Sequence, residues 1–263
     1  MLCAIRRSDN KKVLAADAMK SEQPFFCPRC EDDAILKKGT VKIHHFAHKP
    51  PVTCEYGQGE TEQHRSCKMD VYEGLRECSR FRNVEIEKNL GTLRPDVFAY
   101  MANIPIAIEV QISALTIEQI VYRTSEYAKK GIHVLWLPIY NLYLDAGKYS
   151  PKLWERWIHA AYFGRVYYWV GGIEILPFHF APCTHYVEAH SWFNEDGDEE
   201  SAGGYEKRYK RFRTPTRGKS VSLARNFVPR YRGEPFQSKT LFVPATSFLI
   251  DTQRTWWSKD SYD

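Results

Sequence analysis

The sequence predicts an α/β protein in three parts, and three observations support this prediction. The middle part, residues 59–144, alternates helical and extended hydrophobic patterns in the order α-β-β-β-α-β. The N-terminal part, residues 1–58, carries paired cysteines and histidines in a segment too short to bury a large core. The last part, residues 145–263, is rich in Trp, Tyr, Phe, Arg and Gly, which indicates irregular structure with short strands.

The composition is that of a globular protein. Of the 263 residues, 43% are hydrophobic and 26% are charged, which argues against wholesale disorder. No apolar run reaches the roughly 18 residues that a membrane span needs, and the first twenty residues lack the apolar stretch of a secretion signal. We therefore expect a cytoplasmic protein with no membrane partner.

The middle part gives the clearest secondary-structure pattern. Apolar residues recur at helical spacing in residues 60–81, and branched or aromatic residues alternate in three following segments. The predicted strands are 83–88, 95–101 and 104–112. A second helix is expected over 116–130, with Thr116 as its N-cap and Gly131 as its stop, and the apolar run 132–138 predicts a buried strand.

Two carboxylates give the strongest chemical signal. Asp96 begins one predicted strand and Glu109 lies near the end of the next, so a hairpin would bring them side by side. A carboxylate in an apolar strand is costly unless something pairs with it, and a divalent cation would pair with both. The backbone carbonyl of Val110 could supply a third oxygen ligand, and Gln111 projects from the same face as Glu109.

A stripe of three polar residues follows the preceding helix. Glu60, His64 and Lys68 are spaced four residues apart, so they share one helix face. They either face the same site as the two carboxylates or form an ordinary charged pair on a solvent-facing helix.

These motifs together resemble a known family. Arg94-Pro95-Asp96 and Glu109-Val110-Gln111 resemble the two motifs of the PD-(D/E)XK nuclease superfamily, inside an αβββαβ core. More narrowly, residues 1–140 resemble the competence protein CoiA-like family. The motifs that carry this resemblance are CPRC at 27–30, HFAH at 45–48, Glu60-Thr61-x-x-His64-x-x-x-Lys68, RPD, EVQIS, Arg123-x-x-x-Tyr127 and the strand VLWLP.

The resemblance implies a metal-dependent deoxyribonuclease with a four-stranded mixed sheet between helices. Asp96 and Glu109 would bind Mg²⁺ or Mn²⁺, with His64 and, as a further option, Glu60 completing the metal environment from the helix. The superfamily usually has Lys where this chain has Gln111, and Lys68 is the candidate to supply the missing charge. Glu60, Arg123 and Tyr127 would lie against the DNA beside the metal. For Arg123 and Tyr127 the alternative is packing and surface charge.

The N-terminal cysteines and histidines predict a structural zinc site. A zinc ion takes four N or S ligands tetrahedrally, and its binding energy would substitute for a core that this short part cannot build. The predicted ligands are Cys27, Cys30, His45 and His48. His44 and Cys54 are competing ligands, and the alternative to zinc is a reduced CxxC turn.

The last part contains a basic, aromatic run. A helix is expected over 151–162 and a hairpin around Gly171-Gly172. In residues 205–213 aromatic residues alternate with bases, so rings could stack on nucleobases while the cations neutralise phosphates. The candidate DNA-binding residues here are Lys207, Arg208, Lys210, Arg211 and Arg213. The alternative is a flexible basic loop paired with the acidic residues 195–200.

Three functions are compatible with the sequence. The preferred one is a Mg²⁺-dependent DNA nuclease in competence, recombination or defence against foreign DNA. The second is a nucleic-acid-binding module on a degenerate nuclease fold, for which Gln111 is the main argument. The third is an interaction subunit of a larger DNA-processing or defence assembly, docked through the aromatic C-terminal part.

Overall fold

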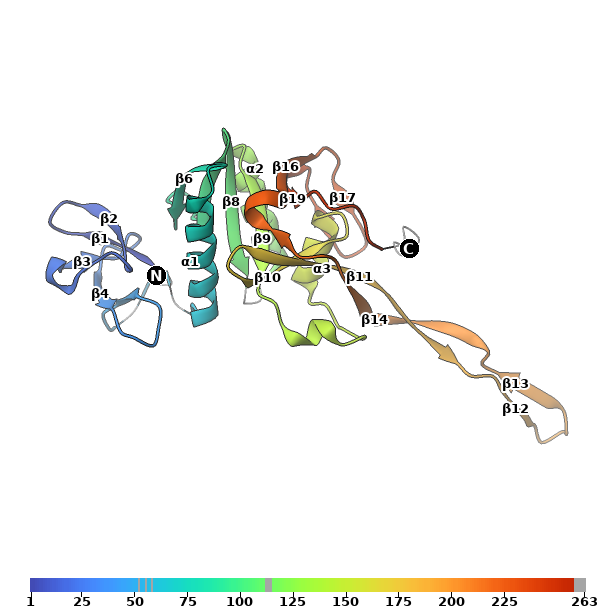
Figure 1. Cartoon of the computed structure of the whole chain (residues 1–263). Helices are drawn as coiled ribbons and strands as arrows, with labels where there is room; N and C mark the ends of the chain where they lie inside the picture. The colour runs from blue at the N-terminus through green and yellow to red at the C-terminus, as the bar shows by residue number, and fades with distance from the viewer. Residues whose placement is uncertain (52, 55, 58, 112–114, 258–263) are drawn as a thin grey trace.

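Three structural units are visible along the chain in the computed structural model (Figure 1). The structure describes residues 1–51, 53–54, 56–57, 59–111 and 115–257, the side chain of Gln111 excepted. A small N-terminal sheet lies at one end of the molecule beside a long helix, a larger mixed sheet forms the middle, and a thin two-stranded extension leaves the other end.

The N-terminal unit is an antiparallel sheet with its own small core. Its strands lie in the order β2-β1-β3-β4-β5. They are β1 (Cys3–Arg6), β2 (Lys11–Leu14), β3 (Phe25–Phe26), β4 (Asp33–Lys37) and β5 (His45–His48), with a 3₁₀ turn η1 (Lys20–Glu22). Phe25 and Phe46 pack tilted against each other, with ring centroids 5.1 Å apart. Leu2 and Cys3 belong to the main core instead, so the start of β1 fixes this unit to the middle of the molecule.

The central segment has the predicted αβββαβ order. Its elements are α1 (Glu62–Glu77), β6 (Phe81–Ile86), β7 (Val97–Met101), β8 (Ile104–Gln111), α2 (Ile117–Lys129) and β9 (His133–Pro138). Thr61 caps α1 by accepting a hydrogen bond from the His64 amide at 3.2 Å. Thr116 caps α2 as predicted, through a reciprocal pair with Gln119.

The central sheet has six strands, not the four that the family resemblance implied. Its order is β16-β19-β9-β8-β7-β6, where β16 (Phe227–Arg232) and β19 (Thr246–Asp251) come from the C-terminal part. β19 pairs parallel with β9 through Phe248 and Val134, and β8 pairs parallel with β9 on the other side. β9 is apolar on both faces. Without β19 this apolar strand would be left with an unpaired, exposed edge, and β19 covers it.

One hydrophobic core spans the middle and last parts of the chain. It includes residues of α1, the central sheet, and the elements that follow residue 145. These further elements are η2 (Leu142–Asp145), α3 (Leu153–Ala161), β10 (Val166–Gly171), β11 (Glu174–Val187), β12 (His190–Phe193), β13 (Glu199–Ala202), β14 (Tyr205–Arg217), β15 (Val221–Ser222), α4 (Leu223–Asn226), β17 (Phe236–Gln237) and β18 (Phe242–Val243). The predicted helix over 151–162 and the hairpin at Gly171-Gly172 are confirmed. Within the described ranges, no helix combines the length and apolar character that a membrane crossing requires.

A long hairpin projects from the body of the molecule. Strands β11 and β14 run outward together and continue into β12 and β13 (Figure 1). We call residues 183–212 the arm. Gly203 makes its bend possible, because its φ of +94° is left-handed and a Cβ there would lie 1.9 Å from the Glu188 carbonyl oxygen.

Candidate active site and metal cluster

Three carboxylates lie side by side where three neighbouring strands of the central sheet end. We call this end of the sheet the sheet edge. The register pairs Ile86 with Val97 and Val97 with Ile108, so the next residues outward are Glu87, Asp96 and Glu109. The Glu87 amide donates to the Asp96 carbonyl at 3.0 Å, which extends the β6–β7 ladder to this edge. The predicted neighbourhood of Asp96 and Glu109 on a hairpin is therefore present, and Glu87 joins them.

Asp96 is held by groups from β8 and α1. Its Oδ2 accepts from the Val110 amide at 2.8 Å and lies 3.3 Å from His64 Nε2, while its Oδ1 lies 3.5 Å from Lys68 Nζ. Burial opposes ionisation of Asp96, but the charges of Lys68 and His64 outweigh it and lower the pKa below its usual range. Asp96 is thus a fixed anion at neutral pH.

Glu109 lies deeper, against α2. Arg123 and Tyr127 both donate to its Oε1, and the residue is 3% exposed. Burial raises the pKa of Glu109, Arg123 lowers it, and the neighbouring charge of Asp96 raises it again, so the net direction is upward. The repulsion between the two carboxylates shows that they share one electrostatic environment.

Lys68 is the central cation of this group. It is 3% exposed and forms ion pairs with Glu60, with Glu87 at 2.7 Å and with Asp96 at 3.5 Å. Burial alone would lower the pKa of Lys68, but the carboxylates raise it well above its ordinary value. The alternative of a solvent-facing charge pair is wrong for Lys68 and Glu60, because both side chains are buried.

Glu87 is a member of the site that the sequence analysis missed. Besides Lys68, it accepts hydrogen bonds from Tyr56 and from the amides of Leu2 and Cys3, the latter two at 3.3 Å. Its φ of +51° is left-handed, a strained conformation for a residue with a side chain. The signal was present in the sequence, because each of the three strands has an acid next to an apolar residue at this end: Glu87 follows Ile86, Asp96 precedes Val97 and Glu109 follows Ile108.

The donor set at this edge suits a hard cation only in part. Asp96 and Glu109 offer carboxylate oxygens that repel each other, which favours a divalent ion between them. In the described part of the chain, however, the ligand atoms of Asp96, Glu109 and His64 do not all lie within 4.8 Å of one another. The Val110 carbonyl as a ligand stays a prediction, and the side chain of Gln111 lies outside the described residues.

Two residues expected to contact DNA are placed elsewhere. Tyr127 is fully buried and its hydroxyl donates to Glu109, so it positions that carboxylate and its ring cannot reach a DNA backbone. Glu60 is buried and its carboxylate pairs with the Lys68 cation, so it does not pair with a phosphate. Arg123 keeps 30% of its side chain exposed and contacts Glu109. Its predicted contact with DNA therefore stays a prediction.

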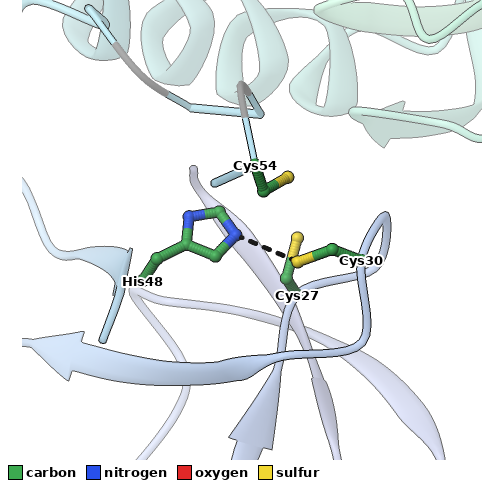
Figure 2. Close-up of side chains that lie close together, drawn as sticks. All are labelled: Cys27, Cys30, His48 and Cys54. Atoms are coloured by element: carbon green, nitrogen blue, oxygen red, sulfur yellow. Dashed lines mark hydrogen bonds between the residues drawn. The ribbon is translucent and has the colours of Figure 1, made fainter. Parts of the chain in front are cut away.

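A second cluster lies in the N-terminal unit. The ligand atoms of Cys27, Cys30, His48 and Cys54 all lie within 4.8 Å of one another, and their side chains converge in Figure 2. Cys30 Sγ and His48 Nε2 are 3.5 Å apart. Three sulfur atoms and one imidazole nitrogen match the ligand types and number of a structural zinc site, so this cluster could hold zinc.

The prediction that His45 is a zinc ligand is wrong, and Cys54 takes its place. His45 and His48 are three residues apart on β5, and side chains of a strand alternate between its faces. The two rings therefore leave opposite faces, and His45 Nδ1 bonds the Ile43 carbonyl at 2.9 Å. Two histidines three residues apart would bring their rings together only if they lay on a helix.

Backbone amides donate hydrogen bonds to two of the sulfur atoms of this cluster. The Arg29 amide donates to Cys27 Sγ and the Tyr56 amide donates to Cys54 Sγ, each at 3.4 Å. Arg94 connects the cluster to the sheet edge, because its guanidinium donates to the Pro28 carbonyl at 3.2 Å and lies 4.5 Å from the centre of the Tyr56 ring. The Arg-Pro-Asp motif therefore contacts the cluster through its first residue and the carboxylate row through its third.

The predicted basic run lies on the arm and at its base. Lys207, Arg208, Lys210 and Arg211 on β14 are exposed, and Arg213 is half-buried. The acidic residues 195–200 lie at the far tip, between and along β12 and β13. The Asn194 side chain organises that tip by accepting from the amides of Asp196 and Asp198 at 3.0 and 2.9 Å. The two charged runs thus occupy different parts of the arm.

Comparisons with known proteins agree with these motifs. Residues 8–57 match the family model described as Competence protein CoiA, N-terminal domain, and residues 60–155 match Competence protein CoiA, nuclease-like domain. A curated relative, Competence protein CoiA of Bacillus subtilis (strain 168), is 29% identical over 120 residues, which are 44% of this chain and 32% of that protein. The match therefore spans about a third of the relative's length. No solved structure matches the chain.

Proposed function

Because this chain belongs to the competence protein CoiA family, we propose that it is a DNA nuclease that hydrolyses phosphodiester bonds with a divalent ion, Mg²⁺ or Mn²⁺. The observation that supports the proposal most is the adjacency of Asp96 and Glu109 on paired strands, with Lys68 beside Asp96. The name of the curated relative refers to competence, so we propose that the DNA is foreign DNA taken up by the cell.

Each residue has a role in this proposal. Asp96, Glu109 and His64 would hold the ion, which would activate a water and neutralise charge on the scissile phosphate. Val110 holds Asp96 through its amide, and Tyr127 and Arg123 hold Glu109. Lys68 keeps its proton because three carboxylates surround it, so it cannot serve as a base. It supplies the fixed positive charge that the superfamily usually takes from a Lys at the position of Gln111.

The proposal is tested by the Asp96→Asn variant, which keeps the size of the side chain and removes its charge. We expect wild-type protein with Mg²⁺ or Mn²⁺ to cut linear and circular DNA, single- or double-stranded. The variant should lose at least about 100-fold in rate and bind DNA nearly as well. Gel assays of products and fluorescence anisotropy of binding measure the two properties. Glu126→Gln, a half-buried acid on α2 that pairs with the exposed Lys129, is the matched control.

Binding without cleavage would support the second candidate function. If wild-type protein shifts DNA but gives no product with either ion, the chain is a binding module on a nuclease-like fold, as the departure at Gln111 suggests. If Asp96→Asn cuts as fast as wild type, the proposed centre is wrong.

We also propose that Cys27, Cys30, His48 and Cys54 bind a structural zinc ion. Support comes from their convergence and from the small size of the apolar core around them. A closed set of four protein ligands fits a structural role, because a catalytic site keeps a position open.

A further inference from the structure

An aromatic pocket lies beside the candidate nuclease centre. It has a volume of about 570 Å³, and its rings come from η2, α3, β10 and the loops that follow β9. The ring-bearing residues are Tyr140, Tyr143, Tyr149, Trp154 and Tyr168. Gln63 also lines it, and Gln63 directly precedes His64 at the start of α1. The pocket therefore opens where β9 ends, at the same edge of the sheet where β8 presents Glu109.

The rings differ in how freely they can meet a ligand. Tyr168 and Trp154 are buried and form the floor, while Tyr140 and Tyr149 are half-buried. Tyr143 is 78% exposed at the rim, on a turn that the buried Leu144 anchors. A large exposed ring on an anchored turn presents a flat apolar surface, which suits stacking against another flat ring.

Polar groups in the pocket also point to a ligand. The Nε1 of Trp154 is a buried hydrogen-bond donor with no partner among the described residues. The acid in the lining, Glu155, is already satisfied by the Tyr149 hydroxyl at 2.8 Å, the Tyr168 hydroxyl at 2.6 Å and the Lys152 amide at 2.7 Å. The acid in the lining therefore has its partners already, which leaves the rings as the surface that meets a ligand.

Two lysines carry positive charge from the pocket toward the arm. Lys148 and Lys152 are exposed and line the pocket. Lys148 Nζ lies 3.8 Å from the ring centre of Tyr209 and 4.3 Å from that of Phe212, both on β14. Pocket and arm are therefore joined by a basic, aromatic surface, the combination that binds unpaired nucleic-acid strands.

We propose that this pocket receives an unpaired base of a DNA strand, so that the protein selects single-stranded DNA next to the bond it cuts. The choice of DNA rests on the proposed function. The stacked base would lie over Tyr143 and the strand's phosphates would follow Lys148 and Lys152. A paired base inside a duplex has both faces stacked and cannot enter a pocket of this kind without leaving its helix.

Binding of the full chain to fluorescent oligothymidine and to a duplex of equal length, without divalent cations, tests the proposal. We expect tighter binding to the single strand. Tyr143→Ala should weaken single-strand binding roughly 5- to 100-fold, the value of one stacked base, and change duplex binding less than about twofold. Tyr143→Phe keeps the ring and should retain affinity. Tyr122→Ala, an exposed tyrosine on α2 outside the pocket, is the matched control.

The outcomes separate this proposal from the nuclease proposal. If Tyr143→Ala binds the single strand as well as wild type, or loses affinity equally for strand and duplex, the pocket does not hold a base. If single-strand binding depends on the Tyr143 ring but neither Mg²⁺ nor Mn²⁺ gives cleavage, the pocket proposal is supported and the nuclease proposal fails. Circular dichroism of each variant shows whether a loss of affinity reflects unfolding.

Discussion

The ammonium group of Lys68 lies among the carboxylates of Glu60, Glu87 and Asp96, out of contact with water. A buried cation of this kind is costly by itself, and each of its partners is costly without it. The charge balance of the sheet edge therefore depends on a residue of α1, one turn after His64. At the residue scale, both the stability of the fold and the proposed chemistry therefore depend on the Lys68 ammonium group.

Replacing Lys68 by Met should lower the free energy of unfolding by about 3–5 kcal/mol, because it leaves buried carboxylates without their cation. Urea denaturation of wild type and variant measures the difference. Lys129→Met is the control, since its ion pair with Glu126 lies on the surface and contributes little to stability. Equal losses in the two variants would contradict a buried role for Lys68.

The acid side of the stability curve should depend on Glu87. Burial opposes its ionisation, but Lys68 and its other neighbours lower the pKa from 4.5 to about 2. The ionised form is thus favoured by folding, so its contribution is present above pH 4.5 and is lost as the pH falls toward 2. Asp96 acts in the same direction, and Glu109, whose pKa is raised, acts in the opposite one.

Denaturation at several pH values below 5 checks this expectation. Wild type should lose stability more steeply than Glu87→Gln, because the amide cannot take up a proton in this range. Parallel curves for the two proteins would mean that Glu87 does not contribute to the acid sensitivity.

The sequence predicted part of this network and missed the rest for definable reasons. Asp96, Glu109, His64 and Lys68 were found because acids in apolar strands and i, i+4 spacing are local signals. Glu87 was passed over as one of two acids in an alternating strand. Its partnership with Lys68 depends on the strand order β6-β7-β8, which a single segment does not reveal. Burial of Tyr127 likewise follows from how α2 packs on the sheet.

At the scale of single elements, β5 decides which residues can bind zinc. Because β5 is a strand, it turns His48 toward the cysteines and His45 away. The fourth member of the cluster is Cys54, six residues later in the chain. The sequence analysis named Cys54 as a competing ligand but could not decide between Cys54 and His45. That decision depends on whether residues 45–48 form a helix or a strand.

Zinc content of purified variants tests this assignment. We expect about one zinc ion per chain in wild type and in His45→Ala. Cys54→Ser should bind zinc at least about 100-fold more weakly, because a hydroxyl is a poor replacement for a thiolate. Metal analysis and a competition titration with a chelator measure both quantities. Loss of zinc from His45→Ala with retention in Cys54→Ser would reverse the assignment.

At the scale of the whole molecule, the C-terminal part completes the fold of the middle part. Its strand β19 covers β9, and the Gly172 amide in the β10–β11 turn donates to Asp70 of α1 at 2.9 Å. Arg80 donates to the carbonyl of Phe227 at 2.7 Å, where β16 begins. The expected boundary near residue 144 therefore runs through a shared core. The sequence could not show this, because β19 pairs with a strand more than a hundred residues earlier.

A chain cut after residue 144 should consequently fail to fold. Loss of β19 and β16 exposes an apolar strand edge and removes the packing of β19 against β9. In the full chain, Phe248→Ala should cost about 3–5 kcal/mol because Phe248 is fully buried at that junction. Solubility, circular dichroism and urea denaturation measure these effects. A soluble 1–144 fragment with a cooperative transition would contradict the shared core.

The parallel pairing of β19 with β9 also sets an order of events during synthesis on the ribosome. The segments that carry Asp96 and Glu109 emerge early, but their sheet lacks its last two strands until residue 251 has left the exit tunnel. A growing polypeptide thus carries the acidic residues for a long interval without a finished scaffold around them. Any cutting activity would begin only after residue 251 has been translated and β19 has paired with β9.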